Sequence, residues 1–279
     1  MTRLPSIAAL IITKNEAVTI ADCIRSCTFA DAIIVLDSAS DDDTRTIAAS
    51  LGARVEVRAF DDYAAQRNAA LLLAANYDWA FMVDADERCP ADLAEEIRRA
   101  VTTADQDTVL FRVRRKDFLF GKWLRHASGY PHWFPRLVRP RHVTFVRPIN
   151  EDLAIQGGEA QLQEHLIHYP FAKGMNHWIE RHNRYSTLEA AQLAHERVVD
   201  TTGVDTLKSR YGEGRRWLKQ IFYRLPCRPL IAFLGLYVWR GGFLDGSAGY
   251  HYARMRAMYE YMICLKQAEA RYAERVRNG

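Results

Sequence analysis

The stretch FMVDADERCP, from Phe81 to Pro90, shows most directly which fold class the chain belongs to. It opens with an uninterrupted apolar run, as expected for a strand that crosses the interior of a sheet. Three carboxylates then follow within four positions, at Asp84, Asp86 and Glu87. Acids grouped at the end of a buried strand indicate a binding site at the edge of a parallel sheet.

The first hundred residues repeat this arrangement as an alternation of strands and helices. Apolar, β-branched runs alternate with stretches in which apolar residues recur at helical spacing. The expected strands are 7–13, 32–38, 54–60 and 79–86, and the expected helices are 15–27, 43–53, 63–75 and 90–101. Buried strands interleaved with helices predict an α/β protein with a mostly parallel, Rossmann-like sheet flanked by helices.

The pattern changes after Val109, where short strand-like runs are mixed with Gly, Pro, aromatic residues and Arg. From Lys173 onward the chain is expected to be largely helical, with a basic, amphipathic stretch from Asp205. We therefore predict a sheet domain over residues 1–172 and a helical, basic C-terminal extension over residues 173–279.

The net charge of +4 conceals a strong polarity along the chain. Residues 1–110 carry 10 Lys and Arg against 19 Asp and Glu, whereas residues 205–279 carry 14 against 6. The acidic part could hold a cation, and the basic part could contact phosphates, nucleic acid or anionic lipid. Because the sequence has no recognisable nucleic-acid-binding motif, we do not expect a nucleic-acid partner.

Cysteine usage and hydropathy bear on the compartment. The five cysteines are an odd number without zinc-ligand spacing, which favours reduced, buried thiols and a cytoplasmic protein. No apolar run reaches the roughly 18–20 residues needed to span a bilayer. The nearest run, Pro229–Trp239, is flanked by arginines and favours peripheral contact with an anionic membrane. The alternative is that this region packs on the sheet domain or on a neighbouring subunit of a homo-oligomer.

Asp84 and Asp86 form a D-x-D pair that could hold a divalent metal. In a strand that continues outward, alternate side chains point the same way, so both carboxylates could face one site. Two such charges repel unless a cation intervenes, and hard oxygen ligands suit Mg²⁺ or Mn²⁺. The alternative is a solvated loop. Asp37, at the end of the second strand, could accept hydrogen bonds from a ribose or base, while the acids at Asp41–Asp43 cap the next helix.

Two common phosphate-binding motifs are absent. The turn after the first strand, Thr13–Thr19, contains no glycine and hence no G-x-G-x-x-G, and no Walker A motif occurs anywhere in the sequence. A bound diphosphate would therefore need a metal and basic side chains. Arg67, Arg136 and Arg139 are the candidates.

Several linked segments resemble one known family. LIITKNE, VLDSASDDDT, FDDYAAQRN and MVDADE occur in the order and spacing of family 2 inverting glycosyltransferases, which have the GT-A fold. FLFGKWLRHASGYPHWFPRLVRP, RPINED and GFLDGSAGYHYA resemble the subgroup that includes lipopolysaccharide-core β-1,4-glucosyltransferases. The resemblance covers most of the chain and makes residues 1–172 the GT-A domain, which would bind a nucleotide-sugar and carry out catalysis.

The resemblance implies roles for individual residues. The nucleotide of the sugar donor would be held by Thr13, Asn15, Glu16, Asp37, Gln66 and Arg67, with Arg136 near the diphosphate. Asp84 would lie against the ribose or the metal, and Asp86 would be the metal ligand. The catalytic base would be Glu151, with Asp152 as second choice. The subgroup commonly has His before this acid, where this chain has Asn150.

The implied function is that of an inverting hexosyltransferase. It would use a nucleotide-sugar, most readily a UDP-sugar, together with Mg²⁺ or Mn²⁺, and a lipid-linked or lipopolysaccharide-core oligosaccharide acceptor. It would act at the inner face of the cytoplasmic membrane. One alternative, a sugar nucleotidyltransferase, would need a Gly-rich basic loop after the first strand, and TKNEAVT lacks one. A second alternative, an inactive carbohydrate-binding relative, would have no need of four intact site acids.

Other polar residues have simpler interpretations. His165 and His168 lack cysteine partners, so we expect them to be strand-borne or surface histidines. Arg115 is expected on a solvated strand face.

Overall fold

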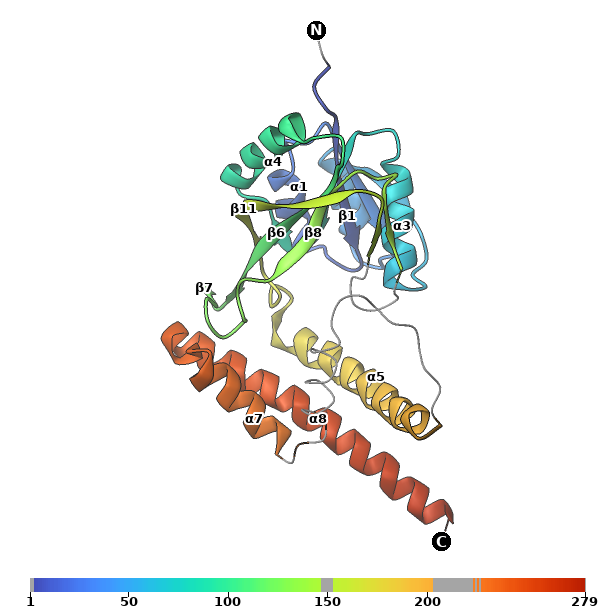
Figure 1. Ribbon diagram of the computed structural model, residues 1–279, viewed down its shortest axis with the longest axis vertical. Helices are drawn as coiled ribbons and strands as arrows, with labels where there is room; N and C mark the ends of the chain where they lie inside the picture. The colour runs from blue at the N-terminus through green and yellow to red at the C-terminus, as the bar shows by residue number, and fades with distance from the viewer. Residues whose placement is uncertain (1–2, 147–152, 203–222, 224, 226, 279) are drawn as a thin grey trace. The chain divides into compact units, whose positions relative to one another are not determined.

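The structure is a computed structural model (Figure 1). The residues that it describes are 3–146, 153–202, 223, 225 and 227–278. The expected base, Glu151, and its alternative, Asp152, lie outside the described residues. The chain forms two compact units: residues 1–118 with 130–172, and residues 119–129 with 173–279. Each unit is described by itself.

The first unit is built on a mixed sheet in the order β3-β2-β1-β4-β8-β6-β11-β5. Its four parallel strands are β1 (Ile7–Thr13), β2 (Ala32–Asp37), β3 (Arg54–Val57) and β4 (Trp79–Asp84). The others are β5 (Glu87–Arg88), β6 (Thr108–Leu119), β8 (Trp133–Val138) and β11 (Gly158–His168). β8 lies antiparallel between β4 and β6, and β11 is parallel to β6 and antiparallel to β5. β9 (Val143–Phe145) and β10 (Leu153–Ile155) form a separate pair.

Helices cover both faces of this sheet, which confirms the predicted α/β class. They are α1 (Ile20–Ser26), α2 (Thr44–Ser50), α3 (Tyr63–Leu73) and α4 (Ala91–Thr103). Alternate residues of β1 join different cores: Ile7 clusters with residues of α1, α2 and α4, and Ala8 with residues of α3. Figure 1 shows α4 and α3 on opposite sides of the sheet. Because both faces are buried, the β1 sequence is continuously apolar.

Several element boundaries differ from the prediction by one to five residues, and two of these boundaries lie beside the strand ends of β1 and β4. The first helix begins at Ile20 and not at Asn15, because Asn15 adopts a left-handed conformation with φ of 55°. The fourth strand ends at Asp84 and not at Asp86. Its continuation is broken because the Glu87 carboxylate accepts a hydrogen bond from the backbone N–H of Asp84, at 3.0 Å. The chain therefore turns at the D-x-D pair before β5 begins.

The second unit is helical, as the sequence predicts for this region. It contains the short strand β7 (Lys122–Trp123) and the helices α5 (Gly174–Thr202), α7 (Arg228–Leu234) and α8 (Gly246–Asn278), with a π-helix η1 (Gly235–Trp239) and a 3₁₀-helix η2 (Gly242–Asp245). α5 and α7 both pack on α8. Within the described part of the chain, no helix is long and apolar enough to cross a membrane.

Candidate active site

The ends of three parallel strands meet at one edge of the sheet. In the strand register, Thr13 of β1 pairs with Asp37 of β2, and Ile12 pairs with Asp84 of β4. Both acidic clusters identified in the sequence therefore lie on the same rim, as predicted.

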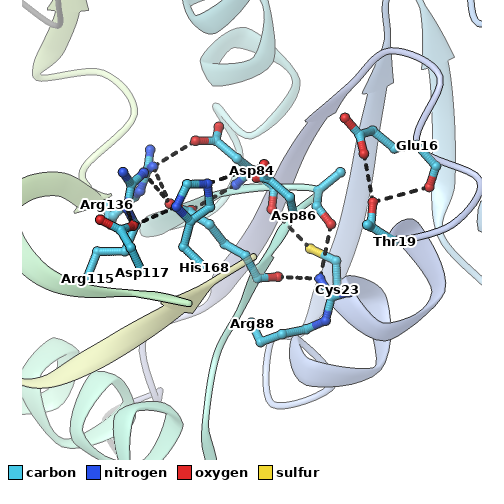
Figure 2. Close-up of polar contacts among 12 residues, drawn as sticks. Glu16, Thr19, Cys23, Asp84, Asp86, Arg88, Arg115, Asp117, Arg136 and His168 are labelled. Atoms are coloured by element: carbon cyan, nitrogen blue, oxygen red, sulfur yellow. Dashed lines mark hydrogen bonds and ion pairs between the residues drawn. The ribbon is translucent and has the colours of Figure 1, made fainter. Parts of the chain in front are cut away.

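Asp84 contacts two arginines, of which Arg136 is labelled in Figure 2. Its Oδ2 atom is 2.8 Å from Nη2 of Arg136, and its Oδ1 atom is 3.5 Å from Nη2 of Arg67. Burial by itself would raise the pKa of Asp84, but the two guanidinium charges hold this pKa well below its usual range. Asp84 is therefore a carboxylate at neutral pH, and much of its charge is neutralised within the protein.

In the part of the chain that the structure describes, Asp86 contacts a histidine and not an arginine. Its Oδ2 atom is 3.3 Å from Nε2 of His168. Although burial opposes ionisation, the neighbouring imidazole lowers the pKa of Asp86. Among the described residues, its Oδ1 atom makes no hydrogen bond, and the side chain is 21% exposed. Asp86 is thus a partly exposed, charged carboxylate with one oxygen that no other described residue bonds.

Glu87 links the turn formed by residues 84–87, which we call the acidic turn, to the arginines. Its side chain is fully buried. Its Oε1 atom accepts hydrogen bonds from Arg136, at 2.7 Å, and from Arg115, at 3.2 Å. Since its Oε2 atom accepts the backbone N–H of Asp84, one side chain fixes both the turn and two cations. Phe134 supports these cations from one side, because its ring lies 4.2 Å from Cζ of Arg115 and 5.5 Å from Cζ of Arg136.

His168 extends the network beyond the turn. Its Nδ1 atom is 2.7 Å from Asp117, which also accepts a hydrogen bond from Arg115 at 3.1 Å. Burial and the charge of Arg115 lower the pKa of His168, but Asp86 and Asp117 outweigh them and raise it to about 9. His168 is therefore an imidazolium at neutral pH, held between two carboxylates (Figure 2).

The sequence interpretation missed part of this network. His168 is on a strand, as expected, but it contacts the D-x-D pair and is mostly buried. Arg115 is not on a solvated strand face, because its side chain is 18% exposed and lies between Glu87 and Asp117. Strand pairing brings these residues together: β11 pairs with β6 and with β5, so that His168 lies beside Asp117 and Glu87.

The nucleotide-site candidates of β1 and β2 form a second group. Both oxygens of Asp37 accept hydrogen bonds from Ser40, at 2.7 Å from its N–H and 2.5 Å from its hydroxyl, and the side chain is fully buried. The Asn15 side chain accepts the backbone N–H of Asp41 at 3.0 Å. Glu16 accepts a hydrogen bond from Thr19 at 2.8 Å. These contacts hold the loops after β1 and β2 against each other.

Neighbouring residues of α3 reach the two groups. The Gln66 amide donates to Ser38 at 3.0 Å and accepts from Arg58 at 2.6 Å, so it ties the end of β2 to the end of β3. Arg67, the next residue, faces Asp84. One helix turn therefore connects the expected nucleotide pocket to the acidic turn.

Arg139 belongs to neither group, contrary to its candidacy for a diphosphate. Its guanidinium lies over the ring of Trp79, 4.5 Å from the ring centroid, and donates to the carbonyl of Thr108 at 2.9 Å. Trp79 begins β4 and Asp84 ends it, so Arg139 lies at the opposite end of that strand. Of the two arginines in PRLVRP, Arg136 is the one at the acidic turn.

Free thiols lie beneath the acidic turn. Cys23, Cys27 and Cys89 are buried and unpaired by disulfides, as predicted. A hydrogen bond to Cys27, together with burial, raises the pKa of the Cys23 thiol well above its usual value. The Cys23 thiol lies 3.5 Å from the carbonyl of Asp84, so this group packs against the turn.

The donor set fits a metal that is shared with a substrate. Among the described residues, no group of three or more His, Cys, Asp or Glu side chains is arranged to hold an ion by itself. Mg²⁺ is typically held by one or two carboxylates together with substrate phosphates. The unbonded oxygen of the partly exposed Asp86 fits that requirement, with Asp84 as the neighbouring carboxylate.

Comparison with known proteins gives consistent matches. The family model described as "Glycosyl transferase family 2" matches residues 8–160. An uncharacterized glycosyltransferase of Rickettsia felis is 32% identical over 199 residues, which cover 67% of this chain and 70% of the relative. The lipopolysaccharide core biosynthesis glycosyltransferase LpsC of Rhizobium meliloti is 28% identical over 269 residues, which cover 93% of this chain and 91% of the relative.

The solved structures that match include a glucosyl-3-phosphoglycerate synthase from Mycobacterium tuberculosis in complex with Mn²⁺, UDP and glucosyl-3-phosphoglycerate. It is 26% identical and covers 41% of this chain and 44% of that chain, with a TM-score of 0.34.

Proposed function

Because the chain belongs to glycosyltransferase family 2, we propose that it transfers a hexose from a nucleotide-sugar to a lipid-linked or lipopolysaccharide-core acceptor. A UDP-sugar is the first candidate donor. The observation that carries the proposal is the charged turn at the rim of the sheet, where Asp86 keeps one carboxylate oxygen that no other described residue bonds, beside Asp84 and its two arginines. The acceptor class is supported by the match to LpsC, which extends over 93% of this chain.

The donor would bind across the two groups of residues at the strand ends. Thr13, Asn15, Glu16 and Asp37 would hold the nucleoside, with Gln66 keeping their loops in place. Asp86, with Asp84 beside it, would hold Mg²⁺ or Mn²⁺ against the diphosphate. When bound, such an ion supplies positive charge where the leaving nucleoside diphosphate becomes more negative.

Arg67 and Arg136 have two functions in this proposal. Their guanidinium groups keep Asp84 ionised, and they bring fixed positive charge to the place where the diphosphate would lie. Glu87 restrains Arg136 through its buried carboxylate, so the arginine does not need to reorganise when the donor binds.

The acceptor hydroxyl would be deprotonated by Glu151, with Asp152 as the alternative base. A base on the face opposite the leaving group allows the acceptor oxygen to attack the anomeric carbon in one displacement, which inverts its configuration. No covalent nucleophile is required. The assignment of this base comes from the family resemblance.

We also propose a cytoplasmic location with peripheral attachment to the membrane. The five free cysteines are compatible with a reducing compartment. A lipid-linked acceptor would require the enzyme to work at a bilayer surface.

The test is calorimetric titration of UDP into the full chain, with and without Mn²⁺. We expect Mn²⁺ to tighten UDP binding in the wild type and to have little effect in Asp86→Asn, which keeps the shape and loses the charge. Glu95→Gln is the matched control, because Glu95 is an exposed acid paired with Arg99 on α4. Failure of UDP to bind in either condition, or an Mn²⁺ effect that survives Asp86→Asn, contradicts the proposal.

A further inference from the structure

A group of large apolar side chains is exposed in the second unit. It comprises Leu230, Ile231, Leu234, Val238, Trp239, Phe243 and Leu244, which we call the α7–η2 face. Trp239 is 90% exposed, and each of the others is between 37% and 59% exposed. Single exposed apolar side chains are common on protein surfaces, but seven within 15 residues are typical of an interaction site.

Three residues of this face are spaced so that they lie on one side of a helix. Leu230, Leu234 and Val238 follow at intervals of four along α7 and η1. The opposite side is packed, because α7 lies against α8 and the aromatic ring of Phe233 contacts those of Tyr237 and Tyr250, at centroid distances of 5.2 and 6.0 Å. The exposed side chains therefore stand on a packed support.

The same segment is cationic. Between Cys227 and Tyr259 the sequence has four arginines, at positions 228, 240, 254 and 256, and one acidic residue, Asp245. Arg240 directly follows Trp239 and is exposed, as is Arg254 on α8. Positive charge thus borders the apolar side chains.

The one acid of this segment does not reach the surface. Asp245 is 2% exposed. Its Oδ2 atom accepts the backbone N–H groups of His126 and Ala127, at 2.9 and 2.8 Å, and its Oδ1 atom is 2.9 Å from Nδ1 of His126. Because these contacts occupy both oxygens, Asp245 offers no exposed carboxylate to repel an anionic partner.

We propose that the α7–η2 face lies in the interface of an anionic lipid bilayer, with Trp239 as its central anchor and Arg240 against the lipid phosphates. Exposed Trp and aliphatic side chains bordered by cations are the combination that an interfacial helix needs. The 12 residues of α7 and η1 are too few to span a bilayer but suffice to lie along its surface. The inference deepens the proposed function, because it names the surface by which the enzyme would reach a lipid-linked acceptor.

The test measures binding of the full chain to vesicles by flotation. Vesicles of equal parts phosphatidylglycerol and phosphatidylcholine are compared with vesicles of phosphatidylcholine alone. We expect the wild type to bind the anionic vesicles, and the binding to weaken as salt is raised. Leu234→Ser with Trp239→Ser should weaken it about tenfold or more, since two large apolar groups no longer leave water. Arg240→Glu should weaken binding to the anionic vesicles and leave any binding to phosphatidylcholine vesicles unchanged.

The control is Leu72→Ser with Tyr272→Ser, which removes two side chains that are 76% and 70% exposed and lie outside the face. It should bind vesicles like the wild type. Loss of binding in this control, or wild-type binding in the α7–η2 variants, overturns the proposal. So does a wild type that ignores vesicles but self-associates through this face in sedimentation, since the partner is then a second copy. UDP titration of the same variants separates this outcome from failure of the proposed function.

Discussion

At the scale of single residues, Glu87 holds three partners through one buried carboxylate. It is fully buried and pairs with Arg136 and Arg115 while holding the backbone of Asp84. Glu87→Gln removes the buried carboxylate that Arg136 and Arg115 share and leaves them only Asp84 and Asp117 as countercharges, so we expect it to lower the free energy of unfolding by about 3 kcal/mol. Urea unfolding measures this. The exposed Glu95→Gln should cost less than about 1 kcal/mol, and equal losses in the two variants would contradict the role assigned to Glu87.

His168 makes a second prediction at this scale, because it orients the proposed metal ligand Asp86. Partners of metal ligands typically contribute 10–100-fold to metal affinity. We expect His168→Gln to reduce the Mn²⁺-dependent gain in UDP affinity about tenfold and to leave UDP binding without metal unchanged. His165→Gln is the control, since His165 contacts Tyr130, at 2.6 Å, and not the acidic turn. A variant that loses metal-free binding equally would show a merely structural role.

The sequence could predict part of this site and not the rest. Asp84 and Asp86 were found because they directly follow an apolar run, and Asp37 because it ends another. His168 and Asp117 are 51 positions apart, and they meet because β11 pairs with β6. That pairing shifts register between Gln161 and His165. Because such an irregularity depends on tertiary packing, no local pattern predicts which β11 side chain faces the acids.

At the scale of elements, the same distinction holds. The bounds of β1 were predicted to the residue, because a strand buried on both faces is a continuous apolar run. The start of α1 was wrong, since it depends on one left-handed residue, Asn15. The end of β4 was also wrong, since it depends on a hydrogen bond from Asp84 to Glu87. Element interiors follow periodicity, whereas their ends follow individual contacts.

The junction of η2 and α8 gives a prediction for an element. A Cβ atom added at Gly249 would lie 1.9 Å from the carbonyl oxygen of Gly242 and 2.8 Å from Cβ of Asp245. Gly249→Ala must therefore push η2 away from α8, and we expect a loss of about 2–3 kcal/mol in the free energy of unfolding. Gly235→Ala is the matched control, because nothing lies within 4 Å of its added Cβ and its φ of −61° is helical. That variant should be neutral or slightly stabilised.

At the scale of the whole molecule, the two units should respond differently to acid. In the first unit, His168 has a pKa of about 9, so it is already protonated at pH 7. The pKa values of Asp84 and Asp86 are lowered, so both stay ionised down to pH 5. In the second unit, the pKa of His182 is lowered to about 4. Burial is the main cause, and the charges of Arg181 and Arg256 add to it. Burial also lowers the pKa of His165 in the first unit and of His177 in the second, but the large shift is that of His182, so we expect acid to destabilise the second unit more.

The sign of the effect follows from proton uptake. Between pH 6.5 and 4, unfolded His182 binds a proton and folded His182 does not, so stability is full above pH 6.5 and falls as the pH drops. His182 stacks on Trp178 of α5 at a centroid distance of 3.7 Å and meets Tyr259 of α8 at 5.4 Å, so its charging should weaken the α5–α8 pair. Allowing for partial exposure, we expect a loss of about 1–2 kcal/mol at pH 5.

Scanning calorimetry of the full chain at pH 7 and pH 5 measures this. We expect the transition of the second unit to move to lower temperature at pH 5, while that of the first unit moves much less. His182→Phe keeps a ring to stack and cannot titrate, so its second-unit transition should lose most of the shift. If both transitions move together in the wild type, or if His182→Phe shifts as much as the wild type does, then His182 is not what makes the second unit sensitive to acid.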